Sequence, residues 1–232
     1  MVSGGYYLTH RAARDRSPEL LPERLISASN CICQFFPDSW AIEWASESAD
    51  ERLRKAATFG ISGVDLPKVI AWATASMQQV FGWPNVFYTL EAAREAREGF
   101  LAQDSEVVIF GLGLHDSHVA EFLEAAKPSP PQRGYAPQGE CGVYECVNAG
   151  NRIPEGGAAA GFELLATYFG LLTCSWLCNG FEQDCATQLG IRPNSNGFVE
   201  TRAEALRCAE LISRKGSGAE PGLWLPWLVT LY

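Results

Sequence analysis

Three cysteines in the C-terminal third of the chain have a spacing that suits thiol chemistry. Cys174, Cys178 and Cys185 stand at positions i, i+4 and i+11, which share one face if the segment is a helix. A cysteine becomes a nucleophile when a helix N-terminus or a nearby histidine lowers its pKa. Cys174 or Cys178 is the candidate nucleophile, and His115 or His118 is the candidate base. Because free cysteine packs like a small hydrophobic residue, the spacing favours a buried helix face over a nucleophile.

The histidines and cysteines lack the spacing of a metal site. His10, His115 and His118 are the three histidines, and the eight cysteines include no CxxC pair. Zinc motifs use such pairs together with further cysteine or histidine ligands. We therefore expect no bound metal and no other cofactor.

The stretch GLGL at residues 111–114 follows an apolar run and precedes a helical pattern. Glycines at such a place let a phosphate approach the amides at the start of a helix. Asp116 stands where the third glycine of the dinucleotide-binding pattern belongs, and its carboxylate repels a phosphate. The stretch is therefore predicted to be a tight turn between a strand and a helix that is capped by Asp116.

Paired carboxylates recur at helical spacing in the middle of the chain. The pairs are Glu91 with Glu95, Glu95 with Glu98, and Glu121 with Glu124. Such pairs can serve as general acid and base. Arg94 and Arg97 lie within the first group, which is typical of an ion-paired helix face in solvent, so we do not expect a catalytic dyad.

The acidic residues are unevenly distributed. Residues 91–150 contain 10 acidic and 4 basic residues, and so carry −6 of the formal net charge of −9. An acidic surface attracts a basic protein partner at a high rate, and exposed aromatic side chains anchor such interfaces. The predicted contact surface consists of Glu91, Glu95, Glu98, Asp104, Glu106, Asp116, Glu121 and Glu124, together with exposed tryptophans. The alternative is that the acidity only keeps the protein soluble.

The overall composition excludes several classes of protein. The chain has 232 residues, of which 47% are hydrophobic and 19% charged, as in a folded chain with a core. The negative charge disfavours binding to nucleic acids and to anionic membranes. The start of the chain has no apolar signal segment and no apolar run is long enough to span a membrane, so we expect a cytoplasmic protein with reduced cysteines.

Helix and strand patterns interleave along the chain without strict alternation. Helices are predicted after the cap residues Ser17, Thr89, Asp116 and Thr201, from Asp65, and over about 50–59. Strands are predicted at 6–9, 40–44, 85–88, 106–110, 162–168 and 223–232. Pro226 predicts that the last strand lies at a sheet edge or is bulged. The pattern predicts an α+β fold, with a mixed or antiparallel sheet and several packed helices, as one domain over 1–232 with a long loop at about 127–139.

Four segments resemble stretches of uncharacterised bacterial proteins: WPNVFYTLEAAREARE, FELLATYFGLLTCSWLCNG, GIRPNSNGF and GLWLPWLVTLY. As an acidic, tryptophan-rich chain without a catalytic signature, the protein also resembles in type the immunity proteins that protect bacteria from their own secreted toxins. The resemblance implies a stoichiometric inhibitor that occludes the active site of a toxin, and such inhibitors are often acidic where the toxin is a basic nuclease. It assigns no binding residue, so the contact surface is inferred from charge alone.

The leading hypothesis is therefore a cytoplasmic immunity protein, not an enzyme, whose partner is a basic toxin rather than a nucleic acid or a membrane. The second hypothesis is a cysteine-dependent hydrolase or transferase that uses the thiol and histidine named above. The third is a sensor that binds a small ligand in an aromatic pocket.

Overall fold

The computed structural model describes residues 1–13, 21, 24–29, 31–37, 48–82, 85–101, 106–127, 142–168, 171–215 and 222–232. Its helices are α1 (Ala49–Thr58), α2 (Leu66–Ser76), α3 (Leu90–Phe100), α4 (Asp116–Ala125), α5 (Gly142–Ala149), α6 (Phe181–Leu189) and α7 (Arg202–Lys215). Its strands are β1 (Val2–His10), β2 (Ala12–Ala13), β3 (Arg24–Leu25), β4 (Phe35–Phe36), β5 (Phe81–Gly82), β6 (Val86–Phe87), β7 (Val107–Leu114), β8 (Ala158–Tyr168), β9 (Leu171–Ser175) and β10 (Leu223–Leu231). The predicted strand at 40–44 lies outside the described residues, as does the predicted loop apart from Lys127.

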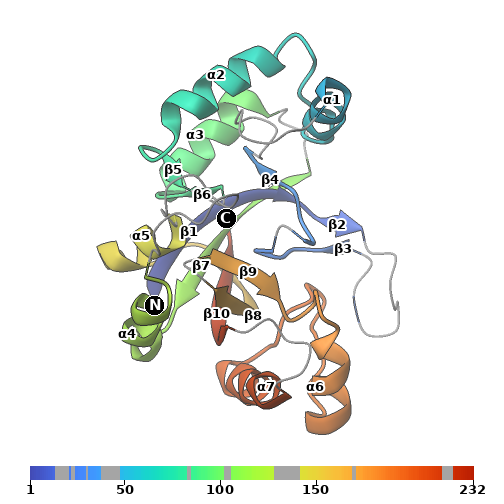
Figure 1. Ribbon diagram of the computed structural model, residues 1–232, viewed down its shortest axis with the longest axis vertical. Coiled ribbons are helices and arrows are strands. Elements are labelled where there is room, and N and C mark those ends of the chain that lie inside the picture. Colours follow the sequence, from blue (N-terminus) through green and yellow to red (C-terminus); the bar gives the residue numbers. More distant parts are fainter. Residues whose placement is uncertain are drawn as a thin grey trace.

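An antiparallel sheet forms the centre of the structure (Figure 1). Its strands follow the order β5-β6-β1-β7-β10-β8-β9, and β4 pairs with one end of β1, while β2 and β3 form a separate hairpin-like pair. The first and last strands, β1 and β10, both pair with β7. The α+β prediction with an antiparallel sheet and packed helices is confirmed.

Alternation along β1 and β7 sends side chains to the two faces of the sheet. Tyr6, Leu8 and Ile109 pack in a core with residues of α1, α2 and α3. Tyr7 and Phe110 point to the opposite face, where their rings stack 5.0 Å apart in a core that includes α4 and α5. The apolar run at 106–110 is therefore covered on both faces. Helix α3 packs against the part of the sheet formed by β1 and β7.

The β8 and β10 half of the sheet is also covered on two sides. Leu164 and Trp224 pack in a core with α6 and α7, the two helices at the lower end of Figure 1. Leu165 and Trp227 face the other way, and the Trp227 ring meets Phe122 of α4 edge to face at 5.2 Å. The sheet is thus the middle layer between helices on both faces.

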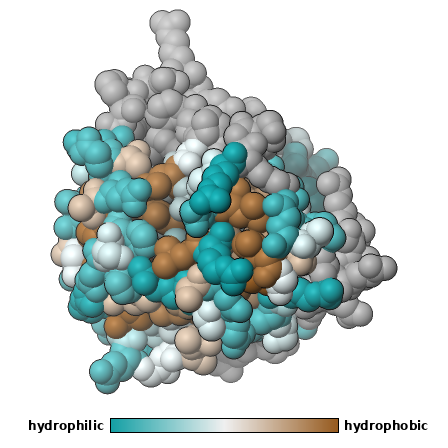
Figure 2. Space-filling view, turned by 90° about the horizontal axis from the view of Figure 1, so that it is seen from below, coloured by the Kyte–Doolittle hydropathy of each residue, from teal (hydrophilic) through white to brown (hydrophobic). Residues whose placement is uncertain are grey.

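The core under α6 and α7 extends toward the surface. Seen from this end of the molecule, hydrophobic residues gather between hydrophilic side chains (Figure 2). Leu189 of α6 and Leu211 of α7 pack against this core but are only half-buried.

Two predicted helix caps are confirmed. Thr89 accepts a hydrogen bond from the Ala92 amide at 3.1 Å, at the start of α3. Thr201 accepts from the Glu204 amide at 3.3 Å and donates to the Glu204 carboxylate at 2.8 Å, before α7. These caps depend on residues three apart, so the sequence alone is enough to identify them.

The cap predicted for α4 is wrong by one residue. His115 is the cap, because its Nδ1 accepts a hydrogen bond from the Ser117 amide at 3.2 Å. Asp116 lies in the first turn instead. A histidine is an uncommon cap, since serine, threonine, aspartate and asparagine are preferred there.

The helix predicted after Ser17 is wrong over its described part. Arg24–Leu25 forms β3, and residues 26–29 continue without helical structure. The apolar spacing of this segment reflects burial against the sheet, where Leu25 and Ile26 are fully buried. Polar contacts to a distant strand, described below, hold the segment in place.

Pro226 lies in an inner strand, so the edge prediction is wrong. Pairing of β10 with β7 begins at Trp227 opposite Leu114, one residue after the proline. Pro226 therefore lies beyond the end of β7, where its lack of an N–H breaks no bond to that strand. A register shift between β10 and β8 does occur, but at Val229/Thr230.

The GLGL stretch lies within β7 and is not a turn, which corrects the prediction. A Cβ at Gly113 would lie 2.2 Å from Cδ1 of Ile153, and a Cβ at Gly111 would lie 3.0 Å from the Tyr6 ring. Both glycines leave space for side chains that cross the sheet surface.

Candidate functional site

A groove of about 810 Å³ lies between the first turns of α3 and the segment 151–154. The groove is lined by residues of β1, of α3, of the turn between β6 and α3, and of the segment 151–154. The lining residues are Ser3, Tyr6, Tyr88, Thr89, Leu90, Glu91, Arg94, Glu95, Glu98, Asn151, Arg152 and Pro154. The groove contains three of the eight acidic residues that the sequence analysis selected.

Helix α3 positions these three carboxylates. Its inner face is buried through Ala93 and Ala96, which leaves the opposite positions in solvent. Glu91, Glu95 and Glu98 are exposed at positions i, i+4 and i+7, which share one helix face. The Thr89 cap fixes where the helix begins and therefore where this face points.

The floor of the groove is aromatic. Tyr6 of β1 is 4% exposed, and its ring meets the ring of Tyr232 edge to face at 5.8 Å. The Tyr232 hydroxyl donates to the Pro154 carbonyl at 3.3 Å. Burial raises the pKa of both phenols, that of Tyr232 to about 12, so both stay protonated at neutral pH.

The segment 151–154 is held to the sheet and to α4. The Ser3 amide donates to the Asn151 carbonyl at 2.7 Å. The Arg152 guanidinium donates to both carboxylate oxygens of Asp116, and the amino group of Met1 lies 3.8 Å from the same carboxylate. The hydrogen bond from Arg152 lowers the pKa of Asp116 to about 2. Arg152 is therefore already paired.

The charge of the groove is negative. Within the described ranges, no cationic group forms an ion pair with Glu91, Glu95 or Glu98. Arg94 faces the same groove from α3, and Arg152 is neutralised by its own partner. The arrangement can bind a cationic group, with carboxylates on one side and tyrosine rings beneath.

The other five predicted contact residues lie elsewhere. On α4, Glu121 lies 3.6 Å from His118, and Glu124 lies 2.6 Å from Lys127. Asp116 pairs with Arg152 at the edge of the groove, Glu106 is exposed just before β7, and Asp104 lies outside the described residues. Among the described residues, Asp116 and Glu124 thus form ion pairs with Arg152 and Lys127, whereas Glu91, Glu95 and Glu98 on α3 form none.

The three cysteines of the thiol hypothesis do not share a helix face. Cys174 lies in β9, Cys178 lies in the turn 176–180, and Cys185 lies in α6. The prediction is wrong because β9 ends at Ser175 and Gly180, in the left-handed region, precedes α6.

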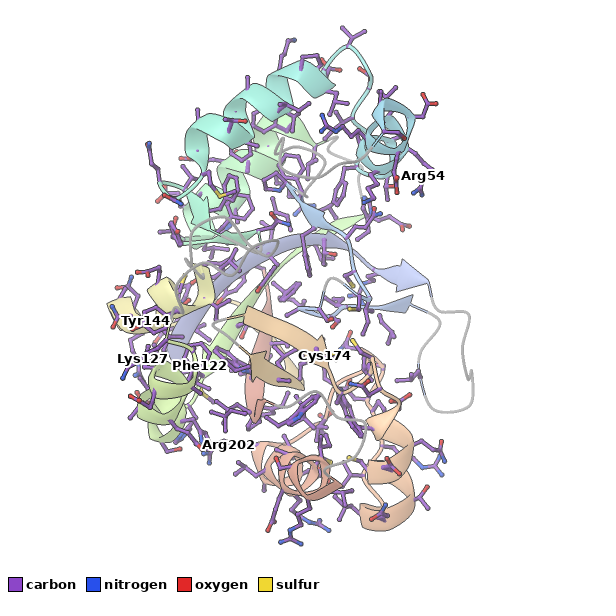
Figure 3. All side chains as sticks on the ribbon, in the orientation of Figure 1. Arg54, Phe122, Lys127, Tyr144, Cys174 and Arg202 are labelled. Carbon is purple, nitrogen blue, oxygen red and sulfur yellow. The ribbon has the colours of Figure 1, made fainter. Side chains whose placement is uncertain are left out.

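The structure does not bring these thiols to the histidines. His115 contacts Ser117, and His118 Nε2 lies 3.2 Å from Arg202 Nη2. Figure 3 labels this arginine, on α7, and Cys174, on β9, at separate places in the structure. A hydrogen bond to Cys31 and burial both raise the pKa of Cys178, which is the opposite of nucleophile activation. The geometry does not support the second hypothesis.

Glu163, a buried carboxylate, is not among the candidate residues that the sequence pattern indicated. Glu163 of β8 is 0% exposed, and it accepts hydrogen bonds from the Ser27 hydroxyl and, at 2.9 Å, from the Ala28 amide. Burial raises its pKa from 4.5 to about 7 although these hydrogen bonds, and one from Ser175, favour the charged form. The signal in the sequence is a single charge inside the apolar run FELLATY.

The described residues contain neither a metal-binding cluster nor a membrane-spanning helix. No group of three or more His, Cys, Asp or Glu side chains there has the geometry to hold a metal ion. In the same part of the chain, no helix combines the length and the apolar character needed to cross a membrane.

Comparison of the chain with models of protein families, with curated proteins and with solved structures gives no match.

Proposed function

We propose that this protein is a cytoplasmic immunity protein that binds a basic toxin through the groove beside α3 and so occludes the active site of the toxin. The observation that carries the proposal is the charge of the groove. Glu91, Glu95 and Glu98 face it without an ion pair from the described residues, and of its two arginines Arg152 is already paired with Asp116.

The chemistry of the groove suits a lysine or arginine side chain of a partner protein. A guanidinium group can pair with two of the carboxylates and stack on the half-buried ring of Tyr88. The aliphatic part of the same side chain can lie along the tyrosine rings. Unpaired carboxylates also attract a basic partner from a distance, and salt weakens that attraction.

The unpaired state of the α3 carboxylates is the reason to place the contact there and not on α4. A carboxylate that already pairs with a cation, as Glu124 does with Lys127, must give up that pair before it binds a partner. Glu91, Glu95 and Glu98 have no such pair to lose among the described residues, so α3 provides the larger gain on binding.

Genetic complementation tests this function. Deletion of the gene should stop growth of the producing strain unless the toxin gene is also inactivated. Growth should return with the wild-type protein and with a control variant, Glu121→Lys/Glu124→Lys/Glu210→Lys. It should not return with Glu91→Lys/Glu95→Lys/Glu98→Lys, which changes the net charge by the same amount at the groove. Normal growth of the deletion strain, or rescue by the α3 variant, would contradict the proposal.

A further inference from the structure

Two cysteines that are far apart in the sequence, Cys31 and Cys178, lie beside Ser29, where Ser29 contacts the turn between β9 and α6. Ser29 Oγ lies 3.3 Å from Cys178 Sγ and, also at 3.3 Å, accepts the hydrogen bond of the Cys31 amide. The Cys178 thiol in turn hydrogen bonds to the sulfur of Cys31. One serine hydroxyl therefore joins both cysteines into a single cluster.

Backbone hydrogen bonds fix the two turns that carry these cysteines. The amides of Ile32 and Cys33 both donate to the Ser29 carbonyl at 3.0 Å, which forms the turn that carries Cys31. On the other side, the Cys178 amide donates to the Ser175 carbonyl at 2.9 Å. Each cysteine thus lies in a hydrogen-bonded turn, and the Ser29–Cys178 contact joins the two turns.

The two thiols differ in exposure. Cys31 is exposed and Cys178 is half-buried. An oxidant from solvent can therefore reach Cys31 first, while Cys178 lies behind it as a second thiol. This combination of an accessible thiol with a neighbouring resolving thiol is characteristic of cysteines that react reversibly with oxidants.

We propose that Cys31 and Cys178 form a reversible disulfide when the protein meets a hydroperoxide. This redox site is separate from the α3 groove and from the binding function proposed for it.

The reaction takes place in two balanced steps. The Cys31 thiolate attacks one oxygen of hydrogen peroxide, the O–O bond breaks, and the departing hydroxide takes a proton to become water. The Cys178 thiol, which stays protonated, then transfers its proton to the sulfenic hydroxyl of Cys31 as its sulfur attacks the sulfenic sulfur. The S–O bond breaks and a second water leaves. Two thiols lose two electrons and two protons, and the peroxide is reduced to two waters. A dithiol reductant reverses the change.

The disulfide would tie the segment that covers Glu163 to the end of β9. It would close the chain between positions 31 and 178, and closure of so long a loop restricts the unfolded chain strongly. The oxidised protein is therefore expected to melt about 5 °C or more above the reduced protein, and dithiothreitol should remove the difference.

The test is to treat the folded full-length protein with hydrogen peroxide, block the remaining thiols, and analyse the peptides by mass spectrometry. The expected product is a linked peptide pair that contains Cys31 and Cys178 and disappears on reduction. Cys31→Ser and Cys178→Ser should each lose both this product and the rise in melting temperature.

Matched variants of neighbouring cysteines complete the test. Cys33 shares a tryptic peptide with Cys31, and Cys174 and Cys185 share one with Cys178, so Cys33→Ser, Cys174→Ser and Cys185→Ser must keep the linked pair. Cys185 and Cys208 also hydrogen bond to each other but are fully buried, so they should stay reduced. Free thiols at both Cys31 and Cys178 after treatment, or a link from Cys31 to Cys174, would overturn the proposal.

Discussion

The carboxylate of Glu163 on β8 accepts a hydrogen bond from the hydroxyl of Ser27, which lies 136 positions earlier in the chain. The next amide, that of Ala28, donates to the other carboxylate oxygen at 2.9 Å. Ser27 Oγ in turn accepts from the Ser29 amide at 3.1 Å. One buried glutamate thus fixes the segment 26–29 on the sheet, and Ser29 at the end of this segment accepts the hydrogen bond of the Cys31 amide.

The pKa of Glu163 predicts how stability depends on pH. The pKa is raised in the folded protein, so between about pH 4.5 and 7 the folded state holds more protons than the unfolded state, and stability falls as pH rises. A change from 4.5 to about 7 corresponds to about 3 kcal/mol. The Glu163→Gln variant has no charge to bury, so its stability relative to wild type should increase over this range. Urea unfolding at pH 4.5, 5.5, 6.5 and 8, followed by tryptophan fluorescence, measures the difference.

A control variant separates Glu163 from the other carboxylates. Glu95→Gln removes one exposed carboxylate of α3 and should change the stability by no more than about 0.5 kcal/mol. A constant difference in stability between wild type and Glu163→Gln from pH 4.5 to 8 would show that the carboxylate does not titrate in this range.

The Ser27–Glu163 contact also shows why part of the fold escaped prediction. The cap of α3 depends on Thr89 and Ala92, three residues apart, and it was predicted correctly. The segment after Ser17 has an apolar spacing close to that of a helix, but its structure depends on a glutamate on β8. Patterns within a short window contain no information about such a partner, so the long-range contact overrides the local preference.

The Asp116–Arg152 pair predicts the opposite dependence on pH. The pKa of Asp116 is lowered from 3.8 to about 2, so the stabilisation is complete above pH 4 and is lost as pH falls through about 2. Asp116→Asn should therefore lower the melting temperature at pH 7 by a small amount, because both side chains are more than half exposed. The melting temperatures of the wild type and of Asp116→Asn, measured at low salt, should approach each other as the pH falls from 7 to 2. If the melting temperatures of the two proteins differed by the same amount at pH 7 and at pH 2, the result would contradict this account of the Asp116–Arg152 pair.

Gly113 of β7 supports the wall of the groove. A Cβ at this position would lie 2.2 Å from Ile153, the neighbour of Arg152 in that wall. Gly113→Ala should therefore destabilise the protein by about 1 kcal/mol, because the end of the half-buried Ile153 side chain must move. Gly99→Ala in α3 is the control, since nothing lies within 4 Å of its Cβ and alanine favours a helix by about 0.5–1 kcal/mol. Denaturant unfolding measures the free energy of unfolding of both variants. If Gly113→Ala were as stable as the wild type, the Ile153 side chain would be free to move away from position 113.

The candidate groove was only partly predictable. The uneven charge of residues 91–150 identified Glu91, Glu95 and Glu98, because acidity and helical spacing are both visible in the sequence. The sequence does not show that Glu124 pairs with Lys127, whereas the α3 carboxylates form no ion pair among the described residues. Nor does it place Tyr6 of β1 beneath α3, since strand order decides which residues share a surface.

The most direct test of the groove is parallel affinity capture from the producing cells at about 150 mM salt. Three tagged proteins are compared: the wild type, the α3 variant Glu91→Lys/Glu95→Lys/Glu98→Lys, and the control Glu121→Lys/Glu124→Lys/Glu210→Lys. The two variants change the net charge equally, so only the position of the charges differs between them.

The account predicts that the wild type and the control retain one basic protein in equimolar amount, and that the α3 variant retains at least tenfold less. The captured protein should bind the wild type more slowly as salt increases, because the unpaired carboxylates attract it electrostatically. Absence of a basic protein on the wild type, or equal retention by the α3 variant, would contradict the proposal that this groove binds a basic toxin.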